Sequence, residues 1–161
     1  MNRFVLVALL ILLVARSSDA WAQPSWARLD EASRAAAGAT MPVLVYVHAP
    51  GCGPCLKMER EVFPHVAPLL DRFARARLDL DDSESRLVID DVALSPAEWA
   101  HRLGANATPT FIFLEPGGGV ITRTSGYTDT RGFALLLAYV ATGAYRHARF
   151  EAYVEQAGGR P

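Results

Sequence analysis

The fold of this 161-residue chain is built around ten residues, His48-Ala49-Pro50-Gly51-Cys52-Gly53-Pro54-Cys55-Leu56-Lys57. Its two cysteines are the only ones in the protein, and they lie three positions apart. An apolar run at 42–47 precedes the stretch, and a segment with helical periodicity follows it. A cysteine pair between a strand and a helix places the first sulfur at the helix N-terminus. Free N–H groups and the helix dipole stabilise a thiolate there. The stretch is therefore predicted to be a dithiol redox site.

Composition indicates a folded domain rather than a disordered chain. Hydrophobic residues make up 51% of the chain and charged residues 20%, which is enough apolar material for a packed core. The length predicts a single domain. The formal net charge is −1 and no basic block occurs, which argues against a nucleic-acid partner. Two cysteines are too few for a disulfide scaffold or a four-thiolate zinc site.

The first 22 residues have the layout of an export signal. Arg3 supplies a positive start, residues 4–15 form an unbroken apolar run, and an Ala-Trp-Ala cleavage sequence occupies 20–22. The apolar run of 12 residues is shorter than the roughly 20 that span a bilayer, which favours cleavage over an uncleaved membrane anchor. We therefore expect a mature start at Gln23 and, in a bacterial cell, a periplasmic location, where disulfides are permitted.

Hydrophobic periodicity predicts alternating helices and strands along the rest of the chain. Helices are expected at 25–39, from about 54 to 63, and at 65–76, 95–104, 129–143 and 145–156; strands are expected at 43–47, 77–81, 108–114 and 120–124. Strand–helix–strand units require parallel pairing, whereas the hairpin around the glycines at 117–119 is antiparallel. The expected architecture is an α/β fold with a central mixed sheet, helices on its faces and an added C-terminal helix. A single domain over 23–157 and a flexible tail over 158–161 are expected.

Local signals add detail to several of these elements. Residues 43–47 are rich in β-branched side chains with little alternation, which predicts a strand buried on both faces. Pro64 is expected to end or kink the preceding helix. Ser95 followed by Pro96 and by a glutamate at the third helical position is a typical helix start. The acidic segment 82–91 is expected to hold a short helical turn at 87–89.

The pattern resembles the thioredoxin superfamily over most of the chain beyond the export signal. Cys52-Gly53-Pro54-Cys55 has the same intervening dipeptide as thioredoxin, and Thr108-Pro109-Thr110 resembles the cis-proline strand of that family. The triple glycine and Gly126-Tyr127 fit the hairpin that follows and its exit. More narrowly, residues 55–63, 73, 79–81 and 126–127 and the aromatic positions at 145–153 are similar to SoxW-type exported proteins linked to sulfur oxidation.

The resemblance implies an exported thioredoxin-fold thiol–disulfide oxidoreductase that mainly reduces protein disulfides. Cys52 would be the exposed nucleophile, and Cys55 the buried thiol that resolves the mixed disulfide. The substrate would bind beside Thr108 and Pro109, and also against Gly53 and Pro54. The resemblance also implies a cis bond before the proline, although local sequence alone would favour trans.

No cofactor and no metal are expected. The chain lacks a dinucleotide fingerprint, so electrons would have to come from a thiol donor in the membrane. His48 and His65 could nominally add nitrogen ligands to the two sulfurs, but structural zinc needs four closely arranged ligands. The acidic residues between 79 and 91 lack the glycine and glutamate spacing of a calcium loop.

The expected partner is a protein disulfide substrate, and the protein is expected to be a monomer. Under the SoxW-type similarity, that substrate would belong to sulfur oxidation or cytochrome maturation. No nucleic-acid partner is expected.

Two residues depart from the thioredoxin pattern and leave the redox direction open. Thioredoxin has a buried acidic residue six positions before its first cysteine, where this chain has Tyr46. It also has an apolar residue before its cis-proline, where this chain has Thr108. A hydroxyl near the sulfurs occurs in some exported isomerases, so a disulfide oxidase or isomerase is one alternative. The other alternative is a non-catalytic binding module in which the cysteine pair only braces the fold.

Overall fold

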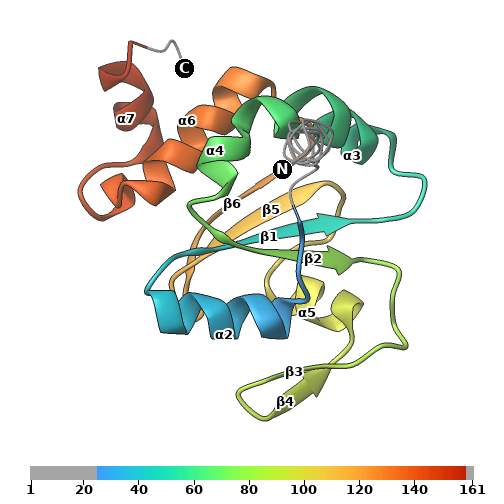
Figure 1. The fold of residues 1–161 in the computed structure, drawn as a ribbon. Coiled ribbons are helices and arrows are strands. Elements are labelled where there is room, and N and C mark those ends of the chain that lie inside the picture. The colour runs from blue at the N-terminus through green and yellow to red at the C-terminus, as the bar shows by residue number, and fades with distance from the viewer. Residues whose placement is uncertain (1–24, 159–161) are drawn as a thin grey trace, which may run out of the picture.

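The computed structural model describes residues 25–158 (Figure 1). The predicted export signal over 1–22 lies outside these residues, as do positions 159–161 of the predicted tail. The helices are α2 (Leu29–Ala39), α3 (Gly53–Lys57), α4 (Ala67–Leu70), α5 (Pro96–Arg102), α6 (Thr130–Ala141) and α7 (Phe150–Gln156), with a π-helical turn η1 (Met58–Val62) and 3₁₀ turns η2 (Phe63–Val66) and η3 (Ala144–Arg146). The strands are β1 (Val43–His48), β2 (Ala74–Asp79), β3 (Leu87–Ile89), β4 (Val92–Leu94), β5 (Thr110–Leu114) and β6 (Val120–Ser125).

Four of the strands form the predicted mixed sheet, in the order β2-β1-β5-β6. β1 and β2 are parallel, as the strand–helix–strand rule requires, and β6 is antiparallel to β5. The second strand–helix–strand unit does not follow that rule, because β5 runs antiparallel to β1. Leu78 and Thr110 both pair with Val47, so the connection that carries α5 leaves and re-enters the sheet at the same end.

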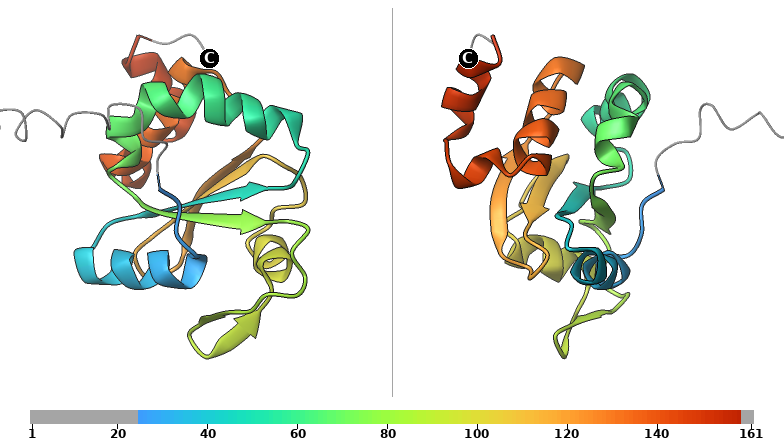
Figure 2. Two further views of the ribbon diagram at one scale, coloured as in Figure 1. Left: turned by 45° about the vertical axis from the view of Figure 1, so that its right-hand side comes forward. Right: turned by 60° about the vertical axis from the view of Figure 1, so that its left-hand side comes forward.

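Helices cover both faces of this sheet (Figures 1 and 2). α3, α4 and α6 lie over one face, α2 and α5 lie over the other, and α7 packs against α6. Along β1, Leu44 and Tyr46 face the first set of helices, whereas Val43, Val45 and Val47 face the second. The prediction of a strand buried on both faces is confirmed.

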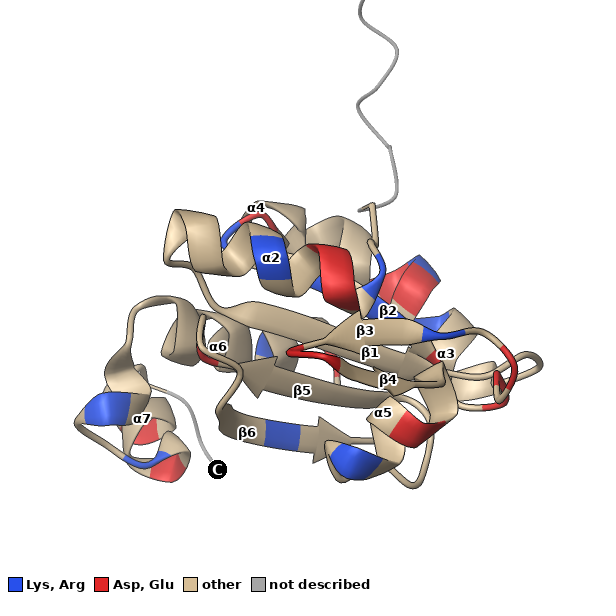
Figure 3. Ribbon diagram, turned by 90° about the horizontal axis from the view of Figure 1, so that it is seen from below, with Lys and Arg blue, Asp and Glu red and all other residues tan. Residues whose placement is uncertain are grey.

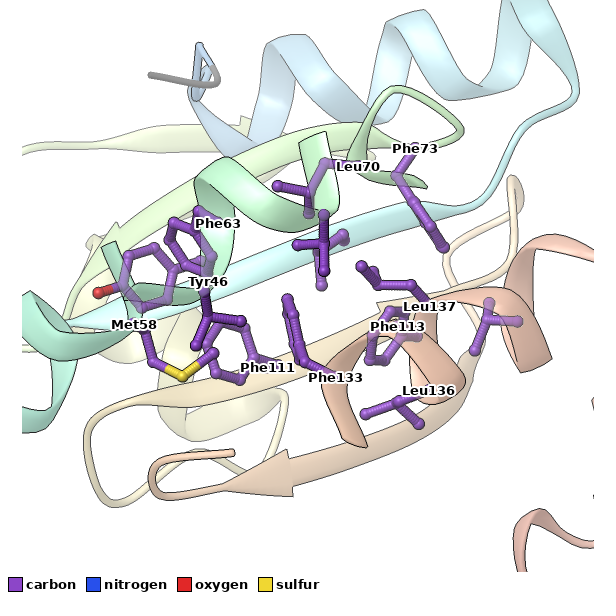
Figure 4. Packing of buried hydrophobic residues seen from close by; sticks show 14 of the residues in the cluster. Tyr46, Met58, Phe63, Leu70, Phe73, Phe111, Phe113, Phe133, Leu136 and Leu137 are labelled. Carbon is purple, nitrogen blue, oxygen red and sulfur yellow. The ribbon is translucent and has the colours of Figure 1, made fainter. Parts of the chain in front are cut away.

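The core beneath α3 and α6 is strongly aromatic (Figure 4). Tyr46 stacks on Phe111 with ring centroids 5.2 Å apart and planes 10° apart. Phe63 meets Tyr46 edge-on at 5.3 Å, and Phe133 lies 4.7 Å from Phe111. Such pairs add about 0.5–1.5 kcal/mol each beyond the area that they bury. The strand and the helical segments on either side of the cysteines therefore share one rigid support.

The N-terminal segment differs from the prediction of a helix over 25–39. α2 begins at Leu29, and Ala27 instead forms a parallel bridge with Ala76 at the edge of β2. Trp26 consequently packs on Tyr46 and Phe63, with ring centroids 5.3 Å and 5.4 Å away. Trp26 and Leu29 are three residues apart, a spacing that predicts one helix face, but the two side chains belong to cores on opposite faces of the sheet.

The prediction for the segment after Pro64 is also wrong in part. A bend at the proline is confirmed, because the π turn η1 gives way there to the 3₁₀ turn η2. The helix expected over 65–76 ends at Leu70, and β2 begins at Ala74 instead of residue 77. Alternating burial across the sequence Ala-Arg-Ala-Arg-Leu-Asp defines the strand. Alanine gives a weak apolar signal, so this alternation was missed.

Two further expectations are wrong. The helical turn expected at 87–89 is strand β3, which pairs with β4 across a turn formed by Asp90 and Asp91. Both aspartates have positive φ, 49° and 63°, as two-residue hairpin turns require. The helix expected over 145–156 is divided into η3 and α7. The expectation of an added C-terminal helix nevertheless holds for α7.

The helix start at Ser95 is confirmed and gives a stability prediction. Ser95 Oγ accepts a hydrogen bond from the Glu98 N–H at 3.1 Å, and the Glu98 carboxylate accepts one from the Ser95 N–H at 2.7 Å. Because this cap is buried, Ser95→Ala should lower the free energy of unfolding by about 1 kcal/mol, measured by urea denaturation. Ser83→Ala, in an exposed loop, is the control, with an expected change within about 0.5 kcal/mol. Equal stabilities of the two variants would contradict the assignment.

On the face shown in Figure 3, α2 and α5 each carry charged residues of both signs, whereas the charged residues of α7 are acidic. This distribution accords with the formal net charge of −1 for the chain. Between residues 25 and 158, no helix combines the length and the apolar character that crossing a bilayer requires.

Candidate active site

β1 carries the cysteine loop to one end of the sheet. The strand ends at His48, and Gly51, with φ of +74°, turns the chain into α3. This left-handed backbone conformation is easily adopted only by glycine. Cys52 is the N-cap residue of α3, and its sulfur accepts a hydrogen bond from the Cys55 N–H at 3.2 Å. Pro54 occupies the first turn, where no intrahelical N–H bond is lost.

The two sulfurs are joined in a disulfide but differ in exposure. Cys55 is 3% exposed and belongs to the aromatic cluster around Tyr46. Cys52 is partly exposed, and the neighbouring Gly53 and Pro54 are exposed. A disulfide that approaches from solvent would therefore meet Cys52 first.

Thr108 and Pro109 lie at the same end of the sheet as the cysteines. Thr110, the first residue of β5, pairs with Val47 near the end of β1, so residues 108–109 stand next to the strand that leads to the cysteines. The Thr108–Pro109 peptide bond is cis. The Pro109 carbonyl accepts a hydrogen bond from the Gly126 N–H at 2.8 Å, and the Thr108 side chain remains partly exposed.

A polar cluster behind the cysteines was missed in the sequence. The Tyr46 hydroxyl donates a hydrogen bond to Glu59 Oε1 at 3.0 Å, and Arg77 Nη2 donates to the same oxygen at 3.2 Å. Arg77 Nη2 also lies 3.2 Å from His48 Nδ1. The spacing of Glu59 four residues after Cys55 was the available signal, because residues four apart share one side of a helix. Arg77 joins them because it is the register partner of Tyr46.

This cluster shifts two pKa values. Burial, together with the adjacent Glu59 carboxylate, raises the pKa of Tyr46, so its hydroxyl remains a proton donor at neutral pH. Burial and the Arg77 guanidinium lower the pKa of His48, although Asp79, Glu59 and Asp81 oppose that change. The His48 imidazole is therefore neutral at pH 7 and above.

A small pocket of about 150 Å³ adjoins the disulfide. Its walls include Cys52, Cys55, Glu59, His48 and Arg77, so the sulfurs and the polar cluster share one space. Over residues 25–158, no group of three or more histidine, cysteine, aspartate or glutamate side chains is arranged to hold a metal ion.

Comparisons with known proteins agree with this geometry. The family model for the thioredoxin-like domain matches residues 29–141. The chain belongs to this family. A thioredoxin-fold protein from Helicobacter pylori has a TM-score of 0.63 at 18% identity, covering 74% of this chain and 86% of that one. A thioredoxin from Thermus thermophilus has a TM-score of 0.60 at 28% identity, covering 80% and 98%.

Another similar structure is the C-terminal domain of DsbD from Neisseria meningitidis, in its reduced form. It has a TM-score of 0.52 at 14% identity, covering 68% of this chain and 90% of that one. A search of curated proteins gave no significant match.

The family and the cysteine pair together establish the fold and the class of chemistry. The chain has the thioredoxin fold that the resemblance implied, with the mixed sheet, the flanking helices and the C-terminal helix that the sequence pattern predicted. A Cys-x-x-Cys pair at the N-terminus of its helix makes the protein a thiol–disulfide oxidoreductase. The narrower similarity to SoxW-type proteins stays a prediction.

Proposed function

We propose that this protein is an exported reductase of protein disulfides that works through Cys52 and Cys55. The observation that carries the proposal is the difference in exposure between a partly exposed Cys52 and a buried Cys55. Nucleophilic attack requires a sulfur that the client can reach, whereas resolution of the mixed disulfide requires a second thiol that lies next to the first sulfur. The Gly-Pro dipeptide between the cysteines, shared with thioredoxin, supports the reductive direction.

The proposed reaction has two exchange steps. The Cys52 thiolate attacks one sulfur of the client disulfide, which forms a Cys52–client bond and releases the other client sulfur as a thiolate. Cys55 then attacks Cys52 Sγ, which forms the intramolecular disulfide and releases the second client thiol. Two electrons pass from the dithiol to the client. A thiol donor in the membrane would restore the dithiol, because the chain has no dinucleotide fingerprint.

The client is proposed to bind as an extended segment across the end of the sheet. The backbone at Thr108 and Pro109 would pair with it, as in strand addition, with Gly53 and Pro54 on the other side of Cys52. Leu56, which lies within α3, and Tyr127, whose ring centroid lies 4.1 Å from Lys57 Nζ, are 48% and 40% exposed. Their apolar surfaces would contact side chains of the client. Under the SoxW-type similarity, the client would be a sulfur-oxidation or cytochrome-maturation protein.

Export is proposed from the sequence of residues 1–22, and the periplasm of a bacterial cell is the proposed location. In that oxidising compartment a reductase needs a dedicated electron supply. An oxidase or isomerase is the second candidate function, and Thr108, a hydroxyl residue before the proline, is the observation that favours it. A purely structural disulfide is less favoured, because it closes a loop too short to restrict the unfolded chain much.

The standard redox potential distinguishes reductase from oxidase. We expect a value near about −270 mV, as in thioredoxin, measured by equilibration in glutathione or dithiothreitol buffers. A value near about −120 mV, typical of a strong oxidant, would overturn the reductive proposal and favour the oxidase. Thr108→Val serves as the test of the hydroxyl, and we expect its potential to be lower than that of the unaltered protein.

A further inference from the structure

The two carboxylate oxygens of Glu59 differ in their hydrogen bonds. Oε1 accepts both the Tyr46 and the Arg77 hydrogen bonds. Oε2 makes no hydrogen bond to any side chain or backbone group of residues 25–158. The carboxylate lines the same 150 Å³ pocket as Cys52 and Cys55. Glu59 thus has an oxygen available to accept a proton, and the residue borders the same pocket as the two cysteines.

The resolving step creates a need for such an acceptor. Cys55 must lose its thiol proton as it attacks Cys52 Sγ, yet its side chain is buried among apolar groups. Burial disfavours the thiolate, so free ionisation is costly at this position. β1 contributes no carboxylate that could accept this proton, because its residue in the cluster with Cys55 that carries a polar group is Tyr46. A phenol with a raised pKa donates a hydrogen bond but does not take a proton.

The fold holds the Glu59 carboxylate from two directions. The helical segment places Glu59 four residues beyond Cys55, and the register between β1 and β2 brings Tyr46 and Arg77 together opposite it. The Glu59 side chain is 25% exposed, so a proton that it receives can pass on to solvent. The other titratable groups near this cluster are His48 on β1, Asp79 on β2 and Asp81 just beyond β2.

We propose that Glu59 is the base that accepts the Cys55 proton in the resolving step. The thiol proton moves to Oε2, either directly or through one water in the pocket, as the Cys55 sulfur bonds to Cys52 Sγ. The client–Cys52 bond breaks in the same step, and the departing client thiolate is protonated by solvent. Glu59 then returns its proton to water. The inference rests on the dithiol exchange of the proposed function, not on its direction.

The test follows the two phases of the reaction between the reduced protein and DTNB in a stopped-flow instrument. The first released nitrothiolate reports attack by Cys52, and the second reports resolution by Cys55. In Glu59→Gln we expect the second phase to slow by about tenfold or more near pH 6. The loss should become smaller as the pH rises, because hydroxide increasingly replaces the carboxylate as the acceptor of the Cys55 proton. The first phase should stay within about twofold of the unaltered protein at every pH.

Two further variants make the result specific. Glu61→Gln removes an exposed carboxylate that is paired with Lys57 on the same helical segment, and both phases should be unchanged. Glu59→Asp keeps a carboxylate and should recover part of the second-phase rate near pH 6. A second phase in Glu59→Gln that matches the unaltered protein, or that is reduced equally at all pH values, would overturn the proposal. Release of one nitrothiolate instead of two per molecule of the unaltered protein would instead refute the dithiol exchange itself.

Discussion

Cys52→Ser is expected to abolish the reduction of insulin disulfides, measured as the turbidity of the released chains in the presence of dithiothreitol. Of the two cysteines, Cys52 is partly exposed, and Cys55 behind it is 3% exposed. Without Cys52, no thiolate can reach a client disulfide from solvent. A serine hydroxyl is far too weakly acidic to take its place at neutral pH.

Cys55→Ser is expected to stop turnover but to preserve the first attack. The mixed disulfide between Cys52 and the client then persists, because the second thiolate is missing. Non-reducing electrophoresis should show a covalent adduct that dithiothreitol removes, and mass spectrometry of this adduct would name the client. The doubly substituted protein is the matched control and should form no adduct. If the unaltered protein showed no reductase activity and Cys55→Ser trapped nothing, the binding-module alternative would be favoured.

Much of this fold could be predicted because its strongest signals are local. The run at 43–47 required a doubly buried strand, and the cap at Ser95 fixed the start of α5 to the residue. The errors occurred where the signal was weak or depended on distant residues. Alanines carry the alternation of β2, and Trp26 packs with a core that its helical spacing did not indicate.

The candidate site likewise contains residues that a local motif predicts and residues that only the folded structure brings together. The cysteine pair and residues 108–109 were found because a short motif carries each of them. The carboxylate cluster was missed because it depends on register, which no local pattern reveals. Placing β2 three residues too late left Arg77 at the start of its strand, whereas the structure pairs it with Tyr46 in the middle. Only that pairing brings a guanidinium and a hydroxyl to Glu59.

Phe111→Ala is expected to lower the free energy of unfolding by about 3–5 kcal/mol. Phe111 is fully buried in the centre of the aromatic cluster, stacked on Tyr46 and in contact with Phe133 (Figure 4). The substitution removes the transfer free energy of the ring and leaves a cavity between the sheet and the helices. Guanidinium denaturation of the oxidised protein, followed by far-ultraviolet circular dichroism, measures the change.

Val120→Ala provides the control on the neighbouring strand. Val120 is 47% exposed, so its truncation should change stability by no more than about 0.5 kcal/mol. A loss below about 1 kcal/mol in Phe111→Ala would show that the cluster collapses around the gap at little cost, contrary to a tightly packed core. Phe111→Leu tests the contribution of the ring stack to function, because leucine fills much of the space but cannot stack on Tyr46. If that stack helps to fix the hydroxyl that holds Glu59, this variant should slow the second DTNB phase near pH 6 and leave the first phase unchanged.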